Sequence, residues 1–387
     1  MAGSIGPLLA SDEQFTHQVV ETFATVGQSD PAWAEKVCGM AAAKDGSLQI
    51  AFGFGKYTNR NVVDAYAGIG RGKEQWIVRG SRALNSDPDS VNVGSIEYEI
   101  IEPLQQIRVR LNANEQQPIA FDIVFKGIAA CVTEDREDRR DMHGFRKATD
   151  QIRYHQSGTA EGWLEIDGER HPVQSSDWIA TRDKSWGIRP SVGMPAADME
   201  PDMHQHIPQA LAIWNPLVFQ RGDGSQYAFH HYYLQFSGPG FMHQRVQGGF
   251  EDEKGKTLVV NGMTPQLQFD AGTKRLQSGE FQFAMADGSE RRMRFEKISE
   301  TGFYLGAGHY HGGDGQHHGS WRGPLHIDGD HVPDASDPAV IERYHQFRDC
   351  LIRVEDLETG DIGFGNCQTH VHGAWPEFGL SGDEPMF

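Results

Sequence analysis

The sequence is poor in cysteine, lacks any long apolar run and is short of positive charge. Its four cysteines lie far apart and form no CxxC pair, so neither a zinc ribbon nor a disulfide framework is expected. Because no run of about 18 apolar residues occurs, no membrane-spanning helix is expected. The first residues, MAGSIGPLLASDEQF, lack the basic and apolar segments of a secretion signal. Free thiols without such a signal predict a cytoplasmic protein.

The charge balance and the missing motifs exclude further classes of function. With 54 acidic and 35 basic residues and a net charge of −19, the chain repels the phosphates of nucleic acids. No P-loop, GxSxG or HExxH motif occurs. The glycine runs GFGKY and AGIGRGKEQ do not join a strand to a helix, so a dinucleotide site is not indicated and no cofactor is expected.

What the sequence has in quantity is short runs of alternating apolar and polar residues separated by turns. Runs such as SLQIAFGFGKY and YAFHHYYLQFSG have the period of two typical of strands, and Asp-Gly pairs at 45–46, 167–168 and 287–288 suit hairpin turns. The pattern predicts roughly eighteen to twenty strands and an all-β fold. Helix spacing is confined to residues 11–26, where Ser11 and Gln14 form a capping pair, and to residues 337–347.

So many strands suit two antiparallel β-barrels better than one. The segment at 190–212 contains proline, methionine and acidic residues but has no period, and we interpret it as the connection. The sequence therefore predicts an N-terminal barrel domain at residues 1–195 and a C-terminal barrel domain at residues 196–387, with a short N-terminal helix.

The run RDKSWGIRP at 182–190 combines groups that neither a solvated surface nor an apolar core requires. On an extended chain Asp183 faces the opposite side from Arg182 and Trp186. Arg182 and Arg189 can each form a bidentate pair with a carboxylate. The run is therefore either a structural lock that fastens the end of a strand or part of a functional site.

Histidine is frequent, with 18 residues. The glycine-rich run GHYHGGDGQHHG places His309 and His311 on one face if it is a strand, which is acceptable geometry for a metal. Asp314 is the one carboxylate near them in sequence, so we favour a ligand-lining loop and expect no metal. His230 and His231 adjoin each other on a strand, and at most one of them faces any cavity.

The run RYHQSG…GW…IDGE…RDKSWGIRP, with VRGSRAL, HGSWRG and WPEFGL elsewhere, resembles the signature of a double-lipocalin (calycin-like) superfamily. That superfamily includes carotenoid 1,2-hydratase, the AttH-like proteins and the survival-factor-like proteins. The resemblance is closest to bacterial members of unknown function, spans nearly the whole chain and implies two tandem lipocalin-like barrels. Two departures argue against a role at those positions: Lys184 stands where histidine or arginine is common, and Asn366 and Cys367 stand where relatives carry a glutamate.

The resemblance implies an enzyme that hydrates, dehydrates, cyclises or isomerises a hydrophobic terpenoid, steroid-like or polycyclic substrate. Such chemistry needs an acid and an aromatic, water-poor cavity but no redox cofactor. We assign the acid to Asp183, whose pKa a dry pocket would raise if the arginines face elsewhere, and further catalytic roles to His309 and His230. The residues expected to bind the substrate are Trp186, Arg189, Tyr154, Trp214, Tyr232 and His311.

Two other interpretations stay open. Calyx-like barrels commonly hold small apolar ligands without reacting with them, and a carrier of this kind should have a wholly apolar cavity with residues 182–190 turned outward as a lock. The third interpretation is a structural module without a ligand. The partner expected is thus a small hydrophobic molecule, and the oligomeric state is left open.

Overall fold

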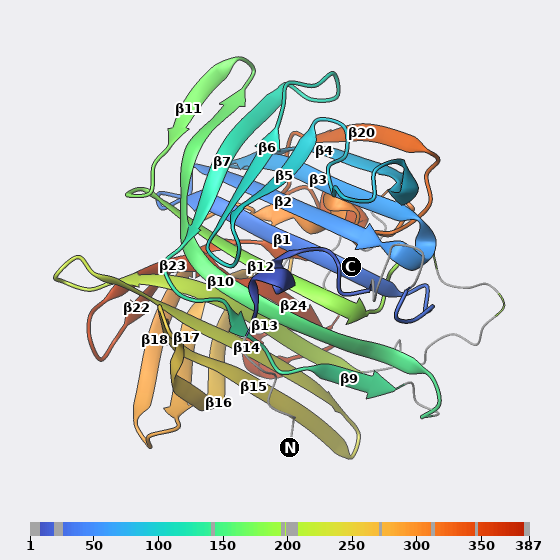
Figure 1. The fold of residues 1–387 in the computed structure, drawn as a ribbon. Coiled ribbons are helices and arrows are strands. Elements are labelled where there is room, and N and C mark those ends of the chain that lie inside the picture. The colour runs from blue at the N-terminus through green and yellow to red at the C-terminus, as the bar shows by residue number, and fades with distance from the viewer. Residues whose placement is uncertain are drawn as a thin grey trace.

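The computed structural model describes residues 8–18, 26–140, 144–194, 198, 208–270, 273–310, 314–344 and 347–382. Over these residues the chain forms two large antiparallel sheets, a half-barrel and a ring, which lie one above the other in Figure 1. The all-β prediction is confirmed. The strands, β1 to β24, exceed the expected number partly because three of them span only two residues, too few to show a period. Among the described residues no helix is long and apolar enough to cross a membrane.

The first sheet is an open half-barrel built mostly from the N-terminal half of the chain. Its strands are β1 Trp33–Ala43, β2 Leu48–Tyr57, β3 Val62–Arg71, β4 Glu74–Ala83, β5 Ile96–Glu102, β6 Gln106–Leu111, β7 Ile119–Gly127, β8 Val132–Thr133, β9 Glu137–Arg140, β10 Lys147–Ile166, β11 Glu169–Val173, β12 Trp178–Ile188 and β20 Leu325–Val332. They follow the order β20-β4-β3-β2-β1-β12-β10-β7-β6-β5, and β8, β9 and β11 pair with β10. The Asp-Gly pairs at 45–46 and 167–168 lie in the turns of two of its hairpins, as predicted.

The second sheet is a ring formed by the C-terminal half. Its strands are β13 Gln209–Gln220, β14 Gln226–Gly238, β15 Phe241–Asp252, β16 Gly255–Phe269, β17 Leu276–Met285, β18 Glu290–Lys297, β22 Leu351–Asp356, β23 Ile362–Asn366 and β24 Gln368–His372. Because β13 pairs with β14 on one side and with β23 and β24 on the other, the sheet returns on itself. Its interior is filled by large apolar side chains such as Phe229, Phe281 and Phe283.

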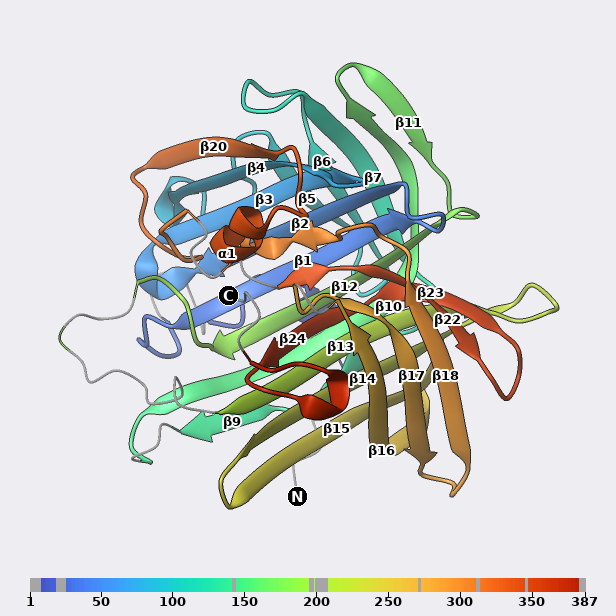
Figure 2. The same ribbon diagram turned by 180° about the vertical axis from the view of Figure 1, so that it is seen from behind.

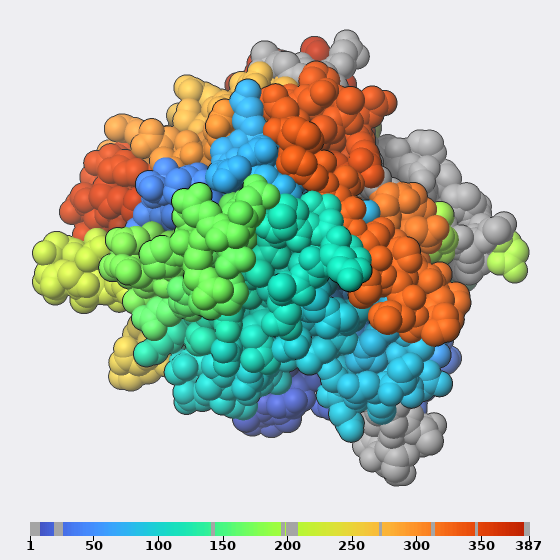
Figure 3. Space-filling model, turned by 90° about the horizontal axis from the view of Figure 1, so that it is seen from above, coloured from blue at the N-terminus to red at the C-terminus, as the bar shows by residue number. Residues whose placement is uncertain are grey.

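Part of the C-terminal half packs against the first sheet. The 3-10 turn η5 (Leu305–Gly308) and helix α1 (Pro338–Tyr344) lie near β1 to β4 in Figure 2, and β20 pairs with β4. Phe303 and Tyr344 share one buried apolar cluster with Tyr66 and Ile77 of the first sheet. Seen from above, the orange residues of β20 adjoin the blue and cyan strands (Figure 3). The helix predicted at 337–347 is confirmed as α1.

The N-terminal helix is shorter than its periodicity predicted. It is a single 3-10 turn, η1 (Ala10–Glu13), whose N-cap position is Leu9 rather than Ser11, and the backbone is already extended at Gln14. Residues 19–25, where the period continued, lie outside the described residues, and so do 195–197 and 199–207 of the expected connection. The other 3-10 turns described are η2 (Thr58–Arg60), η3 (Leu84–Ser86) and η6 (Pro376–Phe378).

The strand predicted through GFYLGAGHY is wrong beyond Tyr304. Only β19 (Phe303–Tyr304) is a strand there, paired with β21 (Arg348–Asp349), and η5 follows it. A Cβ at Gly306 would lie 2.3 Å from the Tyr344 carbonyl oxygen, and one at Gly308 would lie 2.6 Å from the Tyr66 ring. The two glycines therefore let a tight turn press against its neighbours, which a periodic strand pattern does not reveal.

The two large sheets meet where β10 and β12 contact β13 and β23. Alternate residues of β1 and β12 consequently face either the core of the half-barrel or the second sheet. Met40, Ile179, Val218 and Leu351 form an apolar contact between the sheets. Polar residues on this face of β1, β10 and β12 make up the candidate site.

Candidate active site between the two sheets

Arg182 and Lys184 fasten the N-terminal segment inside the half-barrel. The two terminal guanidinium nitrogens of Arg182 donate to the carboxylate oxygens of Glu13 at 2.8 and 2.9 Å, and both side chains are fully buried. Burial alone would raise the pKa of Glu13, but the guanidinium outweighs it and the pKa is lowered. Lys184 Nζ donates to the carbonyl oxygens of Asp12, Glu13 and Gln14, which leaves them without helical partners and ends η1. This half of the motif is a lock.

Trp186 and Tyr154 belong to the same lock. The Trp186 ring stacks on the ring of His17 with centroids 3.8 Å apart, and Tyr154 OH donates to Glu13 Oε1 at 3.0 Å. Both side chains face the interior of the half-barrel, on the opposite side of the sheet from Asp183. The structure therefore does not bring these two expected substrate-binding residues to the acid.

Asp183 points the other way, toward the second sheet. Its neighbours in register are Cys38 on β1 and His155 on β10. The side chain is partly exposed and has no hydrogen-bond or ion-pair partner in the described part of the chain. Burial raises the pKa of Asp183, against the opposing charge of Arg153. A partly accessible, unpaired carboxyl group with a raised pKa is typical of an acid that meets a ligand.

A buried charged cluster lies where β10 faces β14 and β15. His155 sits between two carboxylates, with Nδ1 3.2 Å from Glu134 Oε1 and Nε2 2.8 Å from Glu251 Oε1. Burial alone would lower the pKa of His155, but Glu251 and Glu134 outweigh it and raise the pKa to about 9. Trp214 Nε1 donates to Glu134 Oε1 at 2.8 Å, and Arg153 Nε lies 3.0 Å from Glu134 Oε2. At neutral pH the cluster therefore holds an imidazolium ion.

His230 adds a neutral ring to this cluster. Its ring stacks on that of His155 with centroids 3.6 Å apart, and neither of its nitrogens has a hydrogen-bond partner. Burial, followed by the charge of His155, lowers the pKa of His230 well below its usual value. Trp214 meets the same ring edge to face at 5.9 Å, so the structure brings these two predicted residues together.

The same cluster is the one group among the described residues that could hold a metal ion. Glu134, His155 and His230 bring potential ligand atoms within 4.8 Å of one another. However, the Glu134 oxygens already accept from Trp214 and face Arg153, and both nitrogens of His155 lie against carboxylates. The geometry suits a hydrogen-bonded network better than a metal centre.

Lys36 and Cys38 extend the site along β1. Cys38 Sγ lies 2.6 Å from Tyr310 OH, and Lys36 Nζ lies 3.9 Å from the centroid of the Tyr310 ring. Burial lowers the pKa of Lys36 to about 8. Arg189, expected to bind substrate, donates to Ser185 Oγ at 3.1 Å and so lies at the end of this face.

A second carboxyl group, that of Asp349, is buried near the same face. Asn366 Nδ2 and Gln368 Nε2 both donate to Asp349 Oδ1 at 2.6 Å. Burial raises the pKa of Asp349 to about 6 despite these two amides, and the charge of Asp183 adds to the rise. The resemblance led us to expect no carboxyl group at position 366, and the structure places the Asp349 carboxyl group, from another strand, beside the Asn366 amide.

The histidines of the glycine-rich run have partners of their own. His309 Nδ1 lies 3.1 Å from an Arg322 guanidinium nitrogen, and burial lowers the pKa of His309 to about 4. His318 Nδ1 lies 3.2 Å from Tyr57 OH. His311 lies outside the described residues. Within the described residues no hydrogen bond or ion pair joins His309 to Asp183, so the structure does not connect these two predicted catalytic residues.

Sequence reasoning missed several residues of this site, above all Glu134, His155 and Asp349. A signal was available for His155 alone, because Arg153 and His155 are two apart in the RYHQSG run and so share a face of the strand. The Tyr232 ring, predicted as part of the site, lies 5.5 Å from the Arg153 guanidinium carbon. The pairing of β10 with β12, which sets this face beside Asp183, has no local signal.

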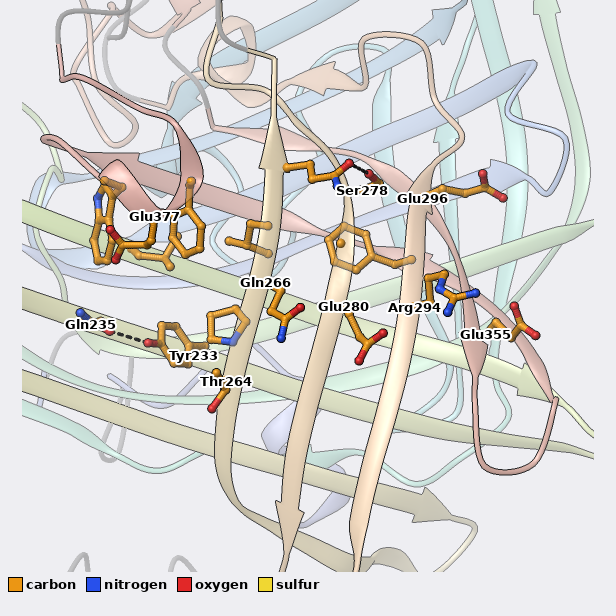
Figure 4. Close-up of a pocket in the computed structure, with 18 of the residues that line it drawn as sticks. Tyr233, Gln235, Thr264, Gln266, Ser278, Glu280, Arg294, Glu296, Glu355 and Glu377 are labelled. Atoms are coloured by element: carbon orange, nitrogen blue, oxygen red, sulfur yellow. Dashed lines mark hydrogen bonds between the residues drawn. The ribbon is translucent and has the colours of Figure 1, made fainter.

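A separate cavity of about 980 Å³ lies along β16, β17 and β18 of the second sheet (Figure 4). Apolar side chains such as Leu211, Phe295 and Trp375 line part of it. Charged residues also line it, namely Glu280, Arg294, Glu296, Arg353, Glu355 and Glu377. A carrier of an apolar ligand is expected to have a wholly apolar cavity, and this one does not meet that expectation.

Comparisons with known proteins agree with the fold. The model of a family of unknown function, DUF8625, matches residues 8–379. The AttH-like protein of Nitrosomonas europaea is similar over 87% of this chain and 92% of its own, with a TM-score of 0.51 at 11% identity. That similarity confirms the double-lipocalin fold and, at such low identity, concerns the fold alone.

Two further solved structures are more distant. The similarity to the structure of CghA with Sch210972 covers 88% of this chain and 88% of CghA, with a TM-score of 0.49 at 12% identity. Kievitone hydratase from Nectria haematococca covers 93% of this chain and 95% of its own, with a TM-score of 0.41 at 10% identity. The structural neighbours thus include a hydratase. No curated protein matches the sequence.

Proposed function

Because this chain belongs to the family of unknown function DUF8625, its activity has to follow from its own side chains, and we propose that it is a cofactor-independent enzyme. Its substrate is a hydrophobic terpenoid, steroid-like or polycyclic compound, and its reaction is a hydration, dehydration, cyclisation or isomerisation. The observation that carries this proposal is the carboxyl group of Asp183. It lies between the two sheets, is partly accessible and makes no hydrogen bond or ion pair within the described residues, and its pKa is raised.

The reaction begins with proton transfer from Asp183 to a carbon–carbon double bond. The O–H bond breaks, a C–H bond forms and a cation remains on the substrate. Tyr66 and Tyr310 lie close enough to Asp183 that its charge adds to the effect of burial in raising their pKa, and their π faces can stabilise a cation. Water or an internal double bond then adds to the cation, and the released proton passes to the Asp183 carboxylate or to Asp349.

The two histidines of the cluster have different roles. Both nitrogens of His155 are occupied by Glu134 and Glu251, so this imidazolium positions the site rather than reacts. His230 makes no hydrogen bond, although its Nε2 lies 3.6 Å from Glu134 Oε1, and it can bond a substrate hydroxyl, but its strongly lowered pKa makes it a weak base. We therefore assign His230 to substrate binding.

The proposal is tested by turnover of a panel of acyclic polyenes, terpenoid alkenes and steroids, followed by liquid chromatography and mass spectrometry. Gain or loss of one water marks hydration or dehydration, and a new retention time at unchanged mass marks cyclisation or isomerisation. Asp183→Asn should lower the rate by about 10²–10⁴, the usual contribution of general acid catalysis. Asp122→Asn is the matched control, because Asp122 lies on β7 and pairs with Arg108.

The carrier interpretation predicts a different result. A carrier would bind members of the panel without converting them, and Asp183→Asn would leave both binding and the absence of turnover unchanged. Turnover that survives Asp183→Asn at the rate of the unmodified protein would exclude Asp183 as the acid.

A further inference from the structure

Lys36 is a buried amine without an acceptor. Only 3% of the residue is exposed, and its Nζ makes no hydrogen bond or ion pair within the described residues. Its close contact is the face of the Tyr310 ring, 3.9 Å from Nζ to the centroid. The register pairs Lys36 with Ser185, so it is a diagonal neighbour of Asp183 on the same face. Buried charged groups are normally paired, so this nitrogen is left available to another group.

Lys184 shows what a structural lysine looks like in this chain. Burial lowers the pKa of Lys184 to about 8, as it does that of Lys36. Lys184 Nζ, however, donates to three backbone carbonyl oxygens on the other side of the sheet. The two lysines share their burial and differ in their partners. Lys36 is the one whose neutral amine has an unengaged lone pair beside an acid.

We propose that Lys36 forms an imine with a carbonyl group of the substrate, which makes the substrate a hydrophobic aldehyde or ketone with a conjugated double bond. This inference rests on the proposed function and names its substrate class. The amine nitrogen attacks the carbonyl carbon and forms a C–N bond. The carbonyl oxygen leaves as water with the two hydrogens lost from nitrogen, and Asp183 protonates the departing oxygen and takes the proton back.

The imine determines at which carbon of the double bond the reaction takes place. When protonated, it draws electrons from the conjugated double bond, so that water adds at the far carbon or the double bond shifts. Hydrolysis of the imine then releases the product and restores the amine. No oxidant or reductant is needed, because each step moves only protons, water and electron pairs within the substrate.

The test is reductive trapping on the full chain. Cuminaldehyde, a hydrophobic aldehyde that cannot enolise, is added at pH 7 with sodium cyanoborohydride, and the modified lysines are located by digestion and mass spectrometry. An amine with a pKa of about 8 is neutral roughly 200 times more often at pH 7 than one at the ordinary value of about 10.4. We expect Lys36 to be labelled at least tens of times faster than the exposed Lys254, and Lys184 to stay unlabelled.

Two comparisons make the result decisive. Lys36→Arg should abolish the fast label while the circular dichroism spectrum and the melting temperature stay those of a folded chain. Labelling of Lys36 no faster than Lys254, or equal labelling of Lys36 and Lys184, would overturn the proposal. If turnover depends on Asp183 but Lys36 is not labelled, the imine is refuted and the proposed function stands. If Lys36 is labelled but no member of the substrate panel is converted, the reactive amine is supported and the acid-catalysed reaction is refuted.

Discussion

Replacing Glu13 by glutamine tests the lock that half of the RDKSWGIRP motif forms. The Glu13 carboxylate is fully buried and accepts from both terminal nitrogens of Arg182, from the hydroxyls of Tyr98 and Tyr154, and from the backbone N–H of Leu104. Glutamine keeps the shape but turns one acceptor into a donor. It also leaves the buried guanidinium without a counter-charge.

The size of the effect follows from that burial. Removing one partner of a buried ion pair costs about 3–5 kcal/mol, since the other charge stays uncompensated. The unfolding equilibrium constant should therefore rise roughly 150- to 5000-fold. Glu165→Gln is the matched control, because its partner Arg170 is 58% exposed and pairs of this kind contribute about 0–1 kcal/mol.

The assay is urea denaturation followed by both tryptophan fluorescence and far-UV circular dichroism, with the free energy extrapolated to water. The double variant Glu13→Gln/Arg182→Met should be more stable than Glu13→Gln alone, because it removes the unpaired charge. If Glu13→Gln loses less than about 1 kcal/mol, as Glu165→Gln should, the pair does not hold the N-terminal segment and the lock is refuted.

Two further variants test the cluster and the motif. Since the pKa of His155 is raised to about 9 from an ordinary 6.5, its contribution to stability is complete below pH 6.5 and is lost as pH rises toward 9. The stability difference between the unmodified protein and His155→Gln should shrink over that window in urea titrations, and a difference that grows would contradict the imidazolium. Gly187 has φ +131, and a Cβ there would lie 2.1 Å from the Asp150 carbonyl oxygen, so Gly187→Ala should cost about 2–5 kcal/mol by the same assay. Gly168→Ala, at φ +83 with nothing within 4 Å of the added Cβ, should cost less, and equal losses would show that the close approach is unimportant.

The sequence by itself determined the local features of this protein. Period-two runs predicted strands and Asp-Gly pairs predicted hairpin turns, because both depend on neighbouring residues. The same alternation assigned Asp183 to the opposite face from Arg182 and Trp186, and the structure has them there. It also predicted that the pKa of Asp183 would be raised if Arg182 and Arg189 faced elsewhere. Arg182 does, because Glu13 holds it, whereas the charge of Arg189 acts to lower the pKa of Asp183 and burial outweighs it.

Only the tertiary structure decided which strands lie side by side and hence which side chains meet. The row of Cys38, Asp183 and His155 exists because β12 pairs with both β1 and β10, which are far apart in sequence. Long-range pairing leaves no mark in local periodicity, so the cluster around His155 and the carboxyl group of Asp349 could not be found beforehand. The short N-terminal helix has the same cause. Lys184, remote in sequence, takes the carbonyl oxygens that a longer helix would need.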